Sequence, residues 1–168
     1  DSYRYRVLQL NNAGAKVENV TFENGKVLNQ YGGNLRVAAG MVSNCVIRSG
    51  LARADNGDAA GGGVVLGGQA GILTHCIVTG NTVDGTSNDK NKAGAAVFVE
   101  PGTKNGRISN LLVAGNRYVT SGEDVKLGTA GVRYGGSNDN TPLENCTIVA
   151  NTVEGSVAGD SAGLYCTS

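Results

Sequence analysis

Few residues of this chain could act as a nucleophile or a base. His75 is the only histidine, so any mechanism with a histidine base would depend on it, and Cys76 follows it directly. A thiol activated by a histidine is a common nucleophilic pair. Alternation along a strand points Cys76 into the interior, however, so we do not expect the pair to react. We predict no catalytic residue.

The four cysteines show no C-x-x-C spacing, which argues against a zinc knuckle and a thioredoxin-type redox site. Carboxylates gather in stretches rich in glycine and asparagine. Asp55 and Asp58 flank an Asn-Gly pair, and hard oxygen ligands around a glycine suit Ca²⁺. Arg53 and several lysines occur in the same stretches, so a solvated edge of mixed charge is the alternative. Ca²⁺ is the one cofactor that the sequence leaves open.

The composition restricts the fold and the partners. The chain has 168 residues, 27 of them glycine, with 14 basic and 14 acidic side chains. This glycine content argues against a helical bundle, because glycine weakens helices. Zero net charge gives no broad electrostatic surface for nucleic acid, and no apolar run approaches the roughly 18 residues of a membrane span. We predict a single domain over residues 1–168.

A six-residue phrase that recurs five times indicates the fold. Its copies start at Val17, Val42, Leu73, Ile108 and Leu143, at spacings of 25, 31, 35 and 35 residues. Apolar residues two positions apart within each copy indicate a strand with one face inward. One inward residue from each copy should then form a single buried column along the repeats: Val20, Cys45, Cys76, Leu111 and Cys146.

A second, shorter phrase follows each copy and contains another strand, as in Gly63–Leu66 and Gly131–Tyr134. Two short strands per 25 to 35 residues cannot bury their own apolar face. Coils stacked at about 4.8 Å, the spacing between paired strands, share one continuous core. The predicted fold is therefore all-β, a parallel β-helix or solenoid of about five coils without clear caps.

An asparagine or a histidine precedes the inward column in every copy, where we expect the corner of a coil. Asn tolerates a bent backbone and its stacked amides can bond along the solenoid, so we predict an asparagine ladder. Its members would be Asn19, Asn44, His75, Asn110 and Asn145. Stacking also places Cys45 and Cys76 on neighbouring coils, within reach of a disulfide. Buried free thiols are the favoured alternative.

The phrases N-C-T-I-V-A-N, G-N-T-V and G-G-G-V-V-L resemble the repeats of right-handed parallel β-helix proteins. These include the pectate-lyase-like superfamily and bacterial surface proteins with repeats of the polymorphic outer-membrane type. The resemblance implies a right-handed coil and an extracellular or cell-surface location. Proteins with such repeats range from polysaccharide lyases to adhesins and spacers, so the resemblance does not specify one function. Lyases of this group use an Arg or Lys base with Ca²⁺, a role that Arg36 or Arg133 could fill here.

The outer face of the first strand has no cluster of carboxylates, which weakens the case for lyase or hydrolase chemistry. It carries an apolar stripe instead, formed by Val46, Ile77 and Leu112. Either a loop covers this stripe or it is a contact surface.

Both ends of the chain fall on the second strand of a coil, which suits a subunit that stacks head to tail or a piece of a longer solenoid. In a head-to-tail stack, Val7, Leu8 and Leu10 of one molecule would cover Leu164 and Tyr165 of the next. We therefore expect an extracellular structural or adhesive module, extended into fibres by its own copies or by flanking coils.

Two further functions remain open, and both have a polysaccharide as the partner. One is a polysaccharide lyase or other carbohydrate-active enzyme. The other is a carbohydrate-binding module in which Tyr31, Arg133 and Tyr134 contact the sugar.

Overall fold

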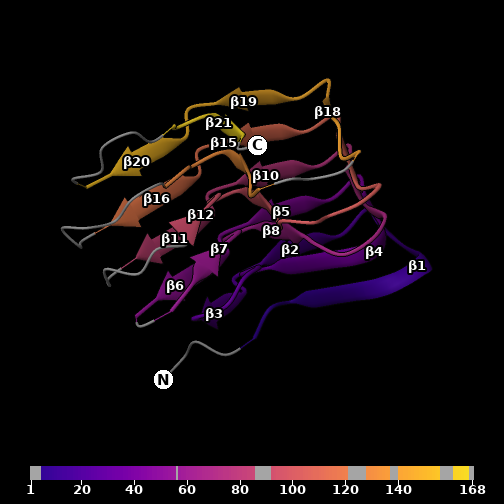
Figure 1. Ribbon diagram of the computed structural model, residues 1–168, viewed down its shortest axis with the longest axis horizontal. Helices are drawn as coiled ribbons and strands as arrows, with labels where there is room; N and C mark the ends of the chain where they lie inside the picture. The colour runs from indigo at the N-terminus through magenta and orange to yellow at the C-terminus, as the bar shows by residue number, and fades with distance from the viewer. Residues whose placement is uncertain are drawn as a thin grey trace.

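The computed structural model describes residues 5–55, 57–85, 92–120, 128–136, 140–155 and 161–166. Within these ranges the regular secondary structure consists of β-strands alone, and Figure 1 shows the strands stacked in successive layers. All pairings between the strands are parallel. No helix able to cross a membrane occurs in these ranges. The chain is thus an all-β parallel solenoid, as predicted.

Three sheets form the walls of the solenoid. The largest has nine strands: β1 (Leu8–Glu18), β4 (Leu35–Ser43), β8 (Val64–Leu66), β9 (Gly71–Thr74), β13 (Val97–Val99), β14 (Arg107–Ser109), β17 (Val132–Tyr134), β18 (Leu143–Glu144) and β21 (Leu164–Cys166). The second has five: β2 (Thr21–Glu23), β5 (Val46–Arg48), β10 (Ile77–Thr79), β15 (Leu112–Ala114) and β19 (Thr147–Val149). The third also has five: β3 (Lys26–Leu28), β6 (Leu51–Ala54), β11 (Thr82–Gly85), β16 (Arg117–Thr120) and β20 (Thr152–Glu154). A separate pair joins β7 (Ala59–Ala60) to β12 (Lys92–Ala93).

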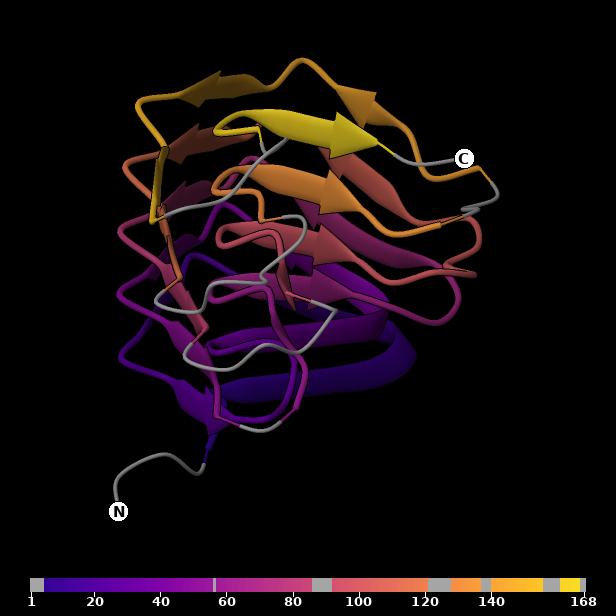
Figure 2. The ribbon, with the colours of Figure 1, turned by 60° about the vertical axis from the view of Figure 1, so that its left-hand side comes forward.

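The chain passes through the same walls in each turn, and we call one level of the stack a rung (Figure 2). The first residues of the long strand β4 pair with β8, and its last residues pair with β9. Two short strands of one turn thus lie beside a single long strand of the preceding turn. In each smaller sheet of five strands, four rung-to-rung steps separate the first strand from the last. The solenoid therefore has about four turns rather than the expected five coils, because the first and last copies of the phrase form its outermost rungs.

The predicted inward column has the expected register. The residue after each member donates its N–H to the carbonyl oxygen of the member one turn earlier, at 2.8–3.1 Å. Cys45, Cys76 and Leu111 are buried. Val20 is 40% exposed and Cys146 is half-buried, because both lie on outermost rungs. The prediction that Val20 is buried was wrong for this reason.

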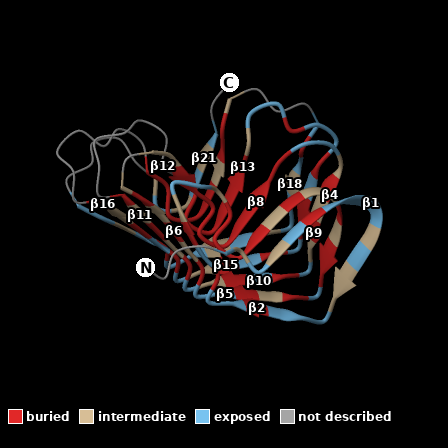
Figure 3. Ribbon diagram, turned by 90° about the horizontal axis from the view of Figure 1, so that it is seen from below, coloured by how far each residue is buried: buried red, intermediate tan, exposed pale blue. Residues whose placement is uncertain are grey.

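The two larger of three apolar cores lie side by side in the cross-section of the solenoid. Figure 3 shows β6, β11 and β16 in an arm beside the body formed by the other walls. The arm holds the smaller core, which includes the buried side chains of Val83 and Tyr118. Opposite walls meet at one narrow point that requires glycine, because a Cβ on Gly50 would lie 2.1 Å from the carbonyl oxygen of Gly62.

The predicted ladder positions are corners of the solenoid, but they do not form a ladder. All of them are exposed and have positive φ: Asn19 (60°), Asn44 (51°), His75 (52°), Asn110 (56°) and Asn145 (52°). In the described part of the chain, no hydrogen bond joins one of these side chains to another. Asparagine serves here because it tolerates the left-handed backbone of the corner.

A buried asparagine ladder exists at another position, formed by Asn34, Asn81, Asn116 and Asn151. The Nδ2 of each member donates to the Oδ1 of the next, at 3.2, 3.0 and 2.9 Å in order along the chain. The last three members directly precede strands of the third sheet. The predicted ladder column is therefore wrong, since corner asparagines and ladder asparagines occur in the same repeat.

Asn34 joins this ladder from the opposite wall, because it precedes β4 in the nine-stranded sheet. Its Nδ2 donates to the carbonyl oxygen of Arg48, two residues before Gly50, at 2.9 Å. Asn81 likewise donates to the carbonyl oxygen of Thr79, two residues before itself, at 3.1 Å. The Asn34 amide thus replaces an asparagine that the chain lacks at Gly50, where an added Cβ would lie 2.5 Å from Asn34 Nδ2.

Candidate functional site

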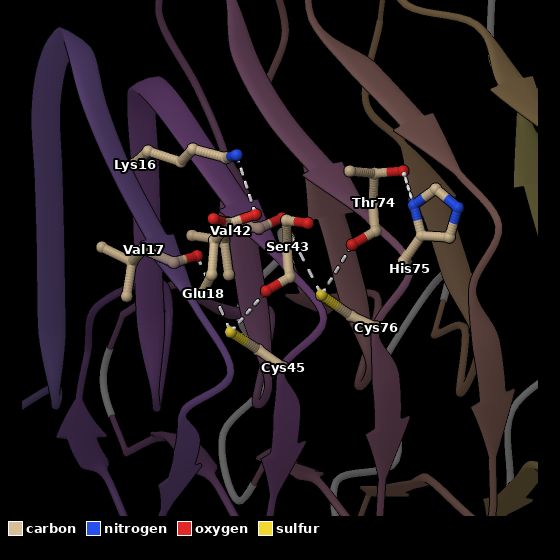
Figure 4. Close-up of polar contacts among 9 residues, drawn as sticks. All are labelled: Lys16, Val17, Glu18, Val42, Ser43, Cys45, Thr74, His75 and Cys76. Atoms are coloured by element: carbon tan, nitrogen blue, oxygen red, sulfur yellow. Dashed lines mark hydrogen bonds and ion pairs between the residues drawn. The ribbon is translucent and has the colours of Figure 1, made fainter.

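The cysteines and the histidine that could carry chemistry meet near one corner of the solenoid (Figure 4). Cys45 and Cys76 are free thiols rather than a disulfide, so the bridge left open by the sequence is not formed. Each Sγ donates to the carbonyl oxygen two residues earlier: Cys45 to Ser43 at 3.0 Å and Cys76 to Thr74 at 3.1 Å. These thiols face the interior, as the alternation predicted for Cys76.

Electrostatics makes Cys76 a poor nucleophile. Burial raises the pKa of its thiol to about 11, and hydrogen bonds with the main chain of Cys45 and Thr74 oppose this rise without cancelling it. The thiolate is the reactive form of cysteine, and it is scarce at neutral pH when the pKa is this high. The structure therefore gives Cys76 the character of a packing residue.

His75 lies exposed beside a short chain of hydroxyl groups. Its Nδ1 lies 2.9 Å from Thr74 Oγ1, which in turn lies 2.9 Å from Ser109 Oγ. A histidine base and a hydroxyl at this distance could form a nucleophilic pair if a third group oriented the ring. No described carboxylate forms an ion pair or hydrogen bond with the His75 ring, so the cluster is not a triad.

An open pocket of about 390 Å³ lies on the outer side of β4. Its lining residues are Arg6, Asn29, Gln30, Tyr31, Arg36 and Asp58. The Tyr31 hydroxyl donates to Asp58 Oδ2 at 3.0 Å. The Tyr31 ring packs edge to face on Phe98, with ring centroids 5.6 Å apart. The pocket thus joins an oriented aromatic ring to charged and amide groups.

Two guanidinium groups line this pocket and differ in their partners. Arg36 forms an ion pair of 2.8 Å with Glu100, which lies two turns further along the stack. Arg6 donates to the side-chain oxygens of Gln9 (3.0 Å) and Gln30 (3.2 Å). No carboxylate of the described residues forms an ion pair with Arg6. The Arg6 guanidinium thus donates hydrogen bonds to neutral amide oxygens, and the Glu100 carboxylate acts on it only as a nearby negative charge.

Shifted pKa values show that these charges are partly removed from water. Burial and the nearby charge of Arg36 lower the pKa of Arg6. Burial raises the pKa of Glu100 and outweighs the opposing effect of Arg36. Burial and the hydrogen bond to Asp58 raise the pKa of Tyr31 to about 12. A cluster of shifted groups in a pocket is the kind of place where a polar ligand binds.

The residues proposed for carbohydrate contact are distributed over different surroundings. Tyr31 lies in the pocket. Arg133 lies over the Tyr165 ring, with Cζ 4.9 Å from its centroid, far along the stack on β17. Tyr134 packs in the larger core and is 9% exposed, so its ring is not available to a sugar, contrary to the prediction. Alternation with the outward Arg133 on the same strand could have shown that Tyr134 points inward.

The two aspartates of the proposed calcium site have separate partners. Asp55 Oδ1 accepts a hydrogen bond from Arg53 Nε at 2.7 Å, while Asp58 accepts from Tyr31. Asn56 between them lies outside the described residues. Across the described part of the chain, no three His, Cys, Asp or Glu side chains are grouped so as to hold a metal ion.

The residues proposed for self-association lie at both ends of the stack. Leu10 is buried against the core, Leu8 is half-buried and Val7 is exposed. At the other end, Leu164 is 43% exposed and Tyr165 is half-buried.

Comparison with known proteins finds no relative: no protein family, no curated protein and no solved structure gives a significant match. The chain is therefore defined by its architecture, as a parallel β-solenoid repeat protein.

Proposed function

We propose that this chain is a non-enzymatic structural or adhesive module that acts by association of the ends of its solenoid. The extracellular setting of this proposal is taken from the resemblance of its repeat phrases to those of β-helix surface proteins. Two observations favour a non-enzymatic role: the buried thiols pack in the core and bond to main-chain carbonyls, and the exposed His75 has no orienting carboxylate among the described residues.

The observation that supports this proposal is a column of buried core residues whose last member is exposed to solvent. Register places Leu35, Val64, Val97 and Val132 one above another, with Leu164 next in line. The first four are 0% exposed, whereas Leu164 is 43% exposed. An inward-facing leucine at this exposure is stabilised when another apolar layer covers it.

Other inward positions show the same difference between the two ends. On the last rung, Ile148 and Val153 are half-buried. Their counterparts on the first rung, Phe22 and Val27, are only 5% and 2% exposed. In these columns the C-terminal end is the more open of the two, whereas Val20 at the N-terminal end is more exposed than Cys146. Most of the inward columns compared thus make the C-terminal end the stronger candidate for association.

The proposal is tested by sedimentation velocity over a range of concentrations. We expect the chain to self-associate and Leu164→Glu, at the open end, to weaken this association. Ile77→Glu is the matched control, because Ile77 is exposed to a similar degree (41%) on a side wall. A chain that stays monomeric at high concentration, or equal loss of association in both variants, would overturn the proposal.

Carbohydrate binding is a second candidate function, which the pocket at Tyr31 and Arg36 favours. Its aromatic ring, amides and guanidinium groups are the donors and surfaces that sugars use. Neutral and acidic oligosaccharides can be titrated into ¹⁵N-labelled protein and followed by NMR. We expect shifts at Gln30 and Tyr31 that Arg6→Gln weakens and that Arg107→Gln, on an exposed part of β14, leaves unchanged. No shift with any saccharide would exclude this function.

A further inference from the structure

We propose that the C-terminal end of the solenoid receives a parallel β-rung that carries an asparagine in phase with Asn151. This inference rests on the end association proposed above and names the chemistry of the partner. It follows from the hydrogen bonds of the asparagine ladder.

The ladder follows one rule through four successive rungs. In each rung, the residue directly before the strand of the third sheet donates its main-chain N–H to the Oδ1 of the next ladder asparagine. The four donors are Gly25, Gly50, Asn81 and Asn116, with bonds of 2.8, 2.9, 3.0 and 3.0 Å. Every rung thus depends on an amide oxygen supplied by its neighbour on the C-terminal side.

Asn151 is the next donor in this series, and no described residue supplies such an amide oxygen on its C-terminal side. Its Oδ1 accepts from Asn116, and its Nδ2 donates to the carbonyl oxygen of Val113 at 3.1 Å. Its main-chain N–H and its second Nδ2 hydrogen have no acceptor among the described residues. Asn151 is only 8% exposed, so these donors are poorly solvated. A buried donor without an acceptor costs free energy that a partner can recover.

An asparagine on the incoming rung would meet every requirement of this position. Its Oδ1 would accept both donors of Asn151, as Asn151 Oδ1 accepts those of Asn116. Its Nδ2 would find the carbonyl oxygen of Ile148, the counterpart of Val78 and Val113, which accept from Asn116 and Asn151. The end is therefore shaped for a rung with the local sequence Ala-Asn-Thr-Val or one close to it.

The N-terminal rung of a second copy does not offer this acceptor. It presents Gly25, which has no side chain, and the nearest ladder amide, Asn34, already accepts the Gly25 N–H at 2.8 Å. The edge of β3 is also occupied, because Lys26 donates its N–H to the carbonyl oxygen of Tyr5 (3.1 Å) in an antiparallel bridge. A head-to-tail contact between copies would leave the Asn151 N–H unpaired.

Amide hydrogen exchange measured by NMR on dilute monomer tests the first step. Thr152 is the internal control, because its N–H donates to the carbonyl oxygen of Asn116 (2.9 Å) in the same rung. We expect the amide of Asn151 to exchange at least tenfold faster than that of Thr152. Equal protection of the two amides would overturn the inference.

A lengthened chain tests the partner. A second copy of residues 135–166 is fused after Cys166, so that a duplicate of Asn151 falls one rung beyond the original. We expect this chain to slow exchange at the original Asn151 at least tenfold, and the same chain with the duplicate changed to Ala to leave it fast. Equal protection by the two lengthened chains, or protection by neither, would contradict the proposal; the comparison with Thr152 in the parent does not depend on how the added rung folds.

Homotypic assemblies separate this inference from the proposed function. In assemblies of the unmodified chain we expect Asn151 to remain in fast exchange. Slow exchange there would mean that a second copy supplies the acceptor, which overturns the inference but leaves end association intact. A chain that never assembles would overturn the proposed function and leave the result with the lengthened chain unchanged.

Discussion

Replacing Asn116 by Ala removes the central member of the asparagine ladder. The side chain of Asn116 takes part in five hydrogen bonds. Its Oδ1 accepts from the main-chain N–H and the Nδ2 of Asn81, and its Nδ2 donates to Val78, Ala114 and Asn151. The whole group is buried, so water cannot easily replace these partners.

The cost follows from the groups that lose their partners. The main-chain N–H of Asn81 loses its acceptor, and a buried unpaired donor costs about 1–3 kcal/mol. The second Asn81 bond and the three bonds donated by Asn116 add a smaller amount, since each net hydrogen bond contributes about 1 kcal/mol and Asn81 Nδ2 keeps two other acceptors. We expect Asn116→Ala to lower the free energy of unfolding by about 2–4 kcal/mol, against roughly 5–15 kcal/mol for a typical domain.

Urea denaturation followed by circular dichroism measures this loss. Asn110→Gly is the control, because Asn110 is an exposed corner asparagine whose φ of 56° glycine adopts without strain. We expect this control to stay within about 0.5 kcal/mol of the parent. If Asn116→Ala were as stable as Asn110→Gly, the buried ladder would not support the fold and this reasoning would be refuted.

Three further predictions concern packing and titration. A Cβ on Gly67 would lie 1.8 Å from Glu100 Oε2, so Gly67→Ala should push this carboxylate toward water and lower its raised pKa; an unchanged value by carbon NMR would contradict this. A Cβ on Gly128 would lie 2.0 Å from the Tyr118 ring, so Gly128→Ala should cost about 1–3 kcal/mol in urea denaturation, and a neutral result would disprove the clash. Burial raises the pKa of Cys76 from 9.0 to about 11, so the folded chain keeps this proton longer than the unfolded chain. The free energy of unfolding should therefore fall as pH rises from 9 to 11, and an equal fall in Cys76→Ala would exclude the thiol as the cause.

The register of the solenoid could be predicted from the sequence because each copy of the phrase contributes one residue per column. Cys45, Cys76 and Leu111 stack as expected. The exposure of Val20 could not be deduced from the phrase, since burial also depends on whether a rung lies on the other side.

The asparagine ladder was assigned to the wrong column for a local reason. Asn110 and Asn116 occur within one repeat, and both residue type and spacing allow stacking at either place. The backbone decides between them, because a left-handed corner turns Asn110 outward whereas Asn116 precedes a strand and faces the interior. The recurring G-N phrase before the third sheet was the available signal. Asn34 could not be found this way, because it reaches the ladder from the opposite wall.

The pocket was visible in the sequence only in part. Tyr31 was recognised as an aromatic surface, but its partners come from distant segments. Arg36 and Glu100 are 64 residues apart and meet because two intervening turns bring β13 beside β8 and β8 beside β4. Arg6 is placed by the N-terminal segment, which lies outside the repeat and so outside any pattern that the repeat could reveal.

The parallel pairing of the rungs has a mechanical consequence. Hydrogen bonds between rungs run along the axis of the solenoid, so tension applied between its two ends loads them in series. The rungs should then peel away one at a time. A released repeat of 35 residues would extend from the spacing of a single rung, about 4.8 Å, to as much as about 120 Å. Under load, a module built in this way lengthens in discrete steps and dissipates energy at each one, instead of transmitting force as a rigid strut.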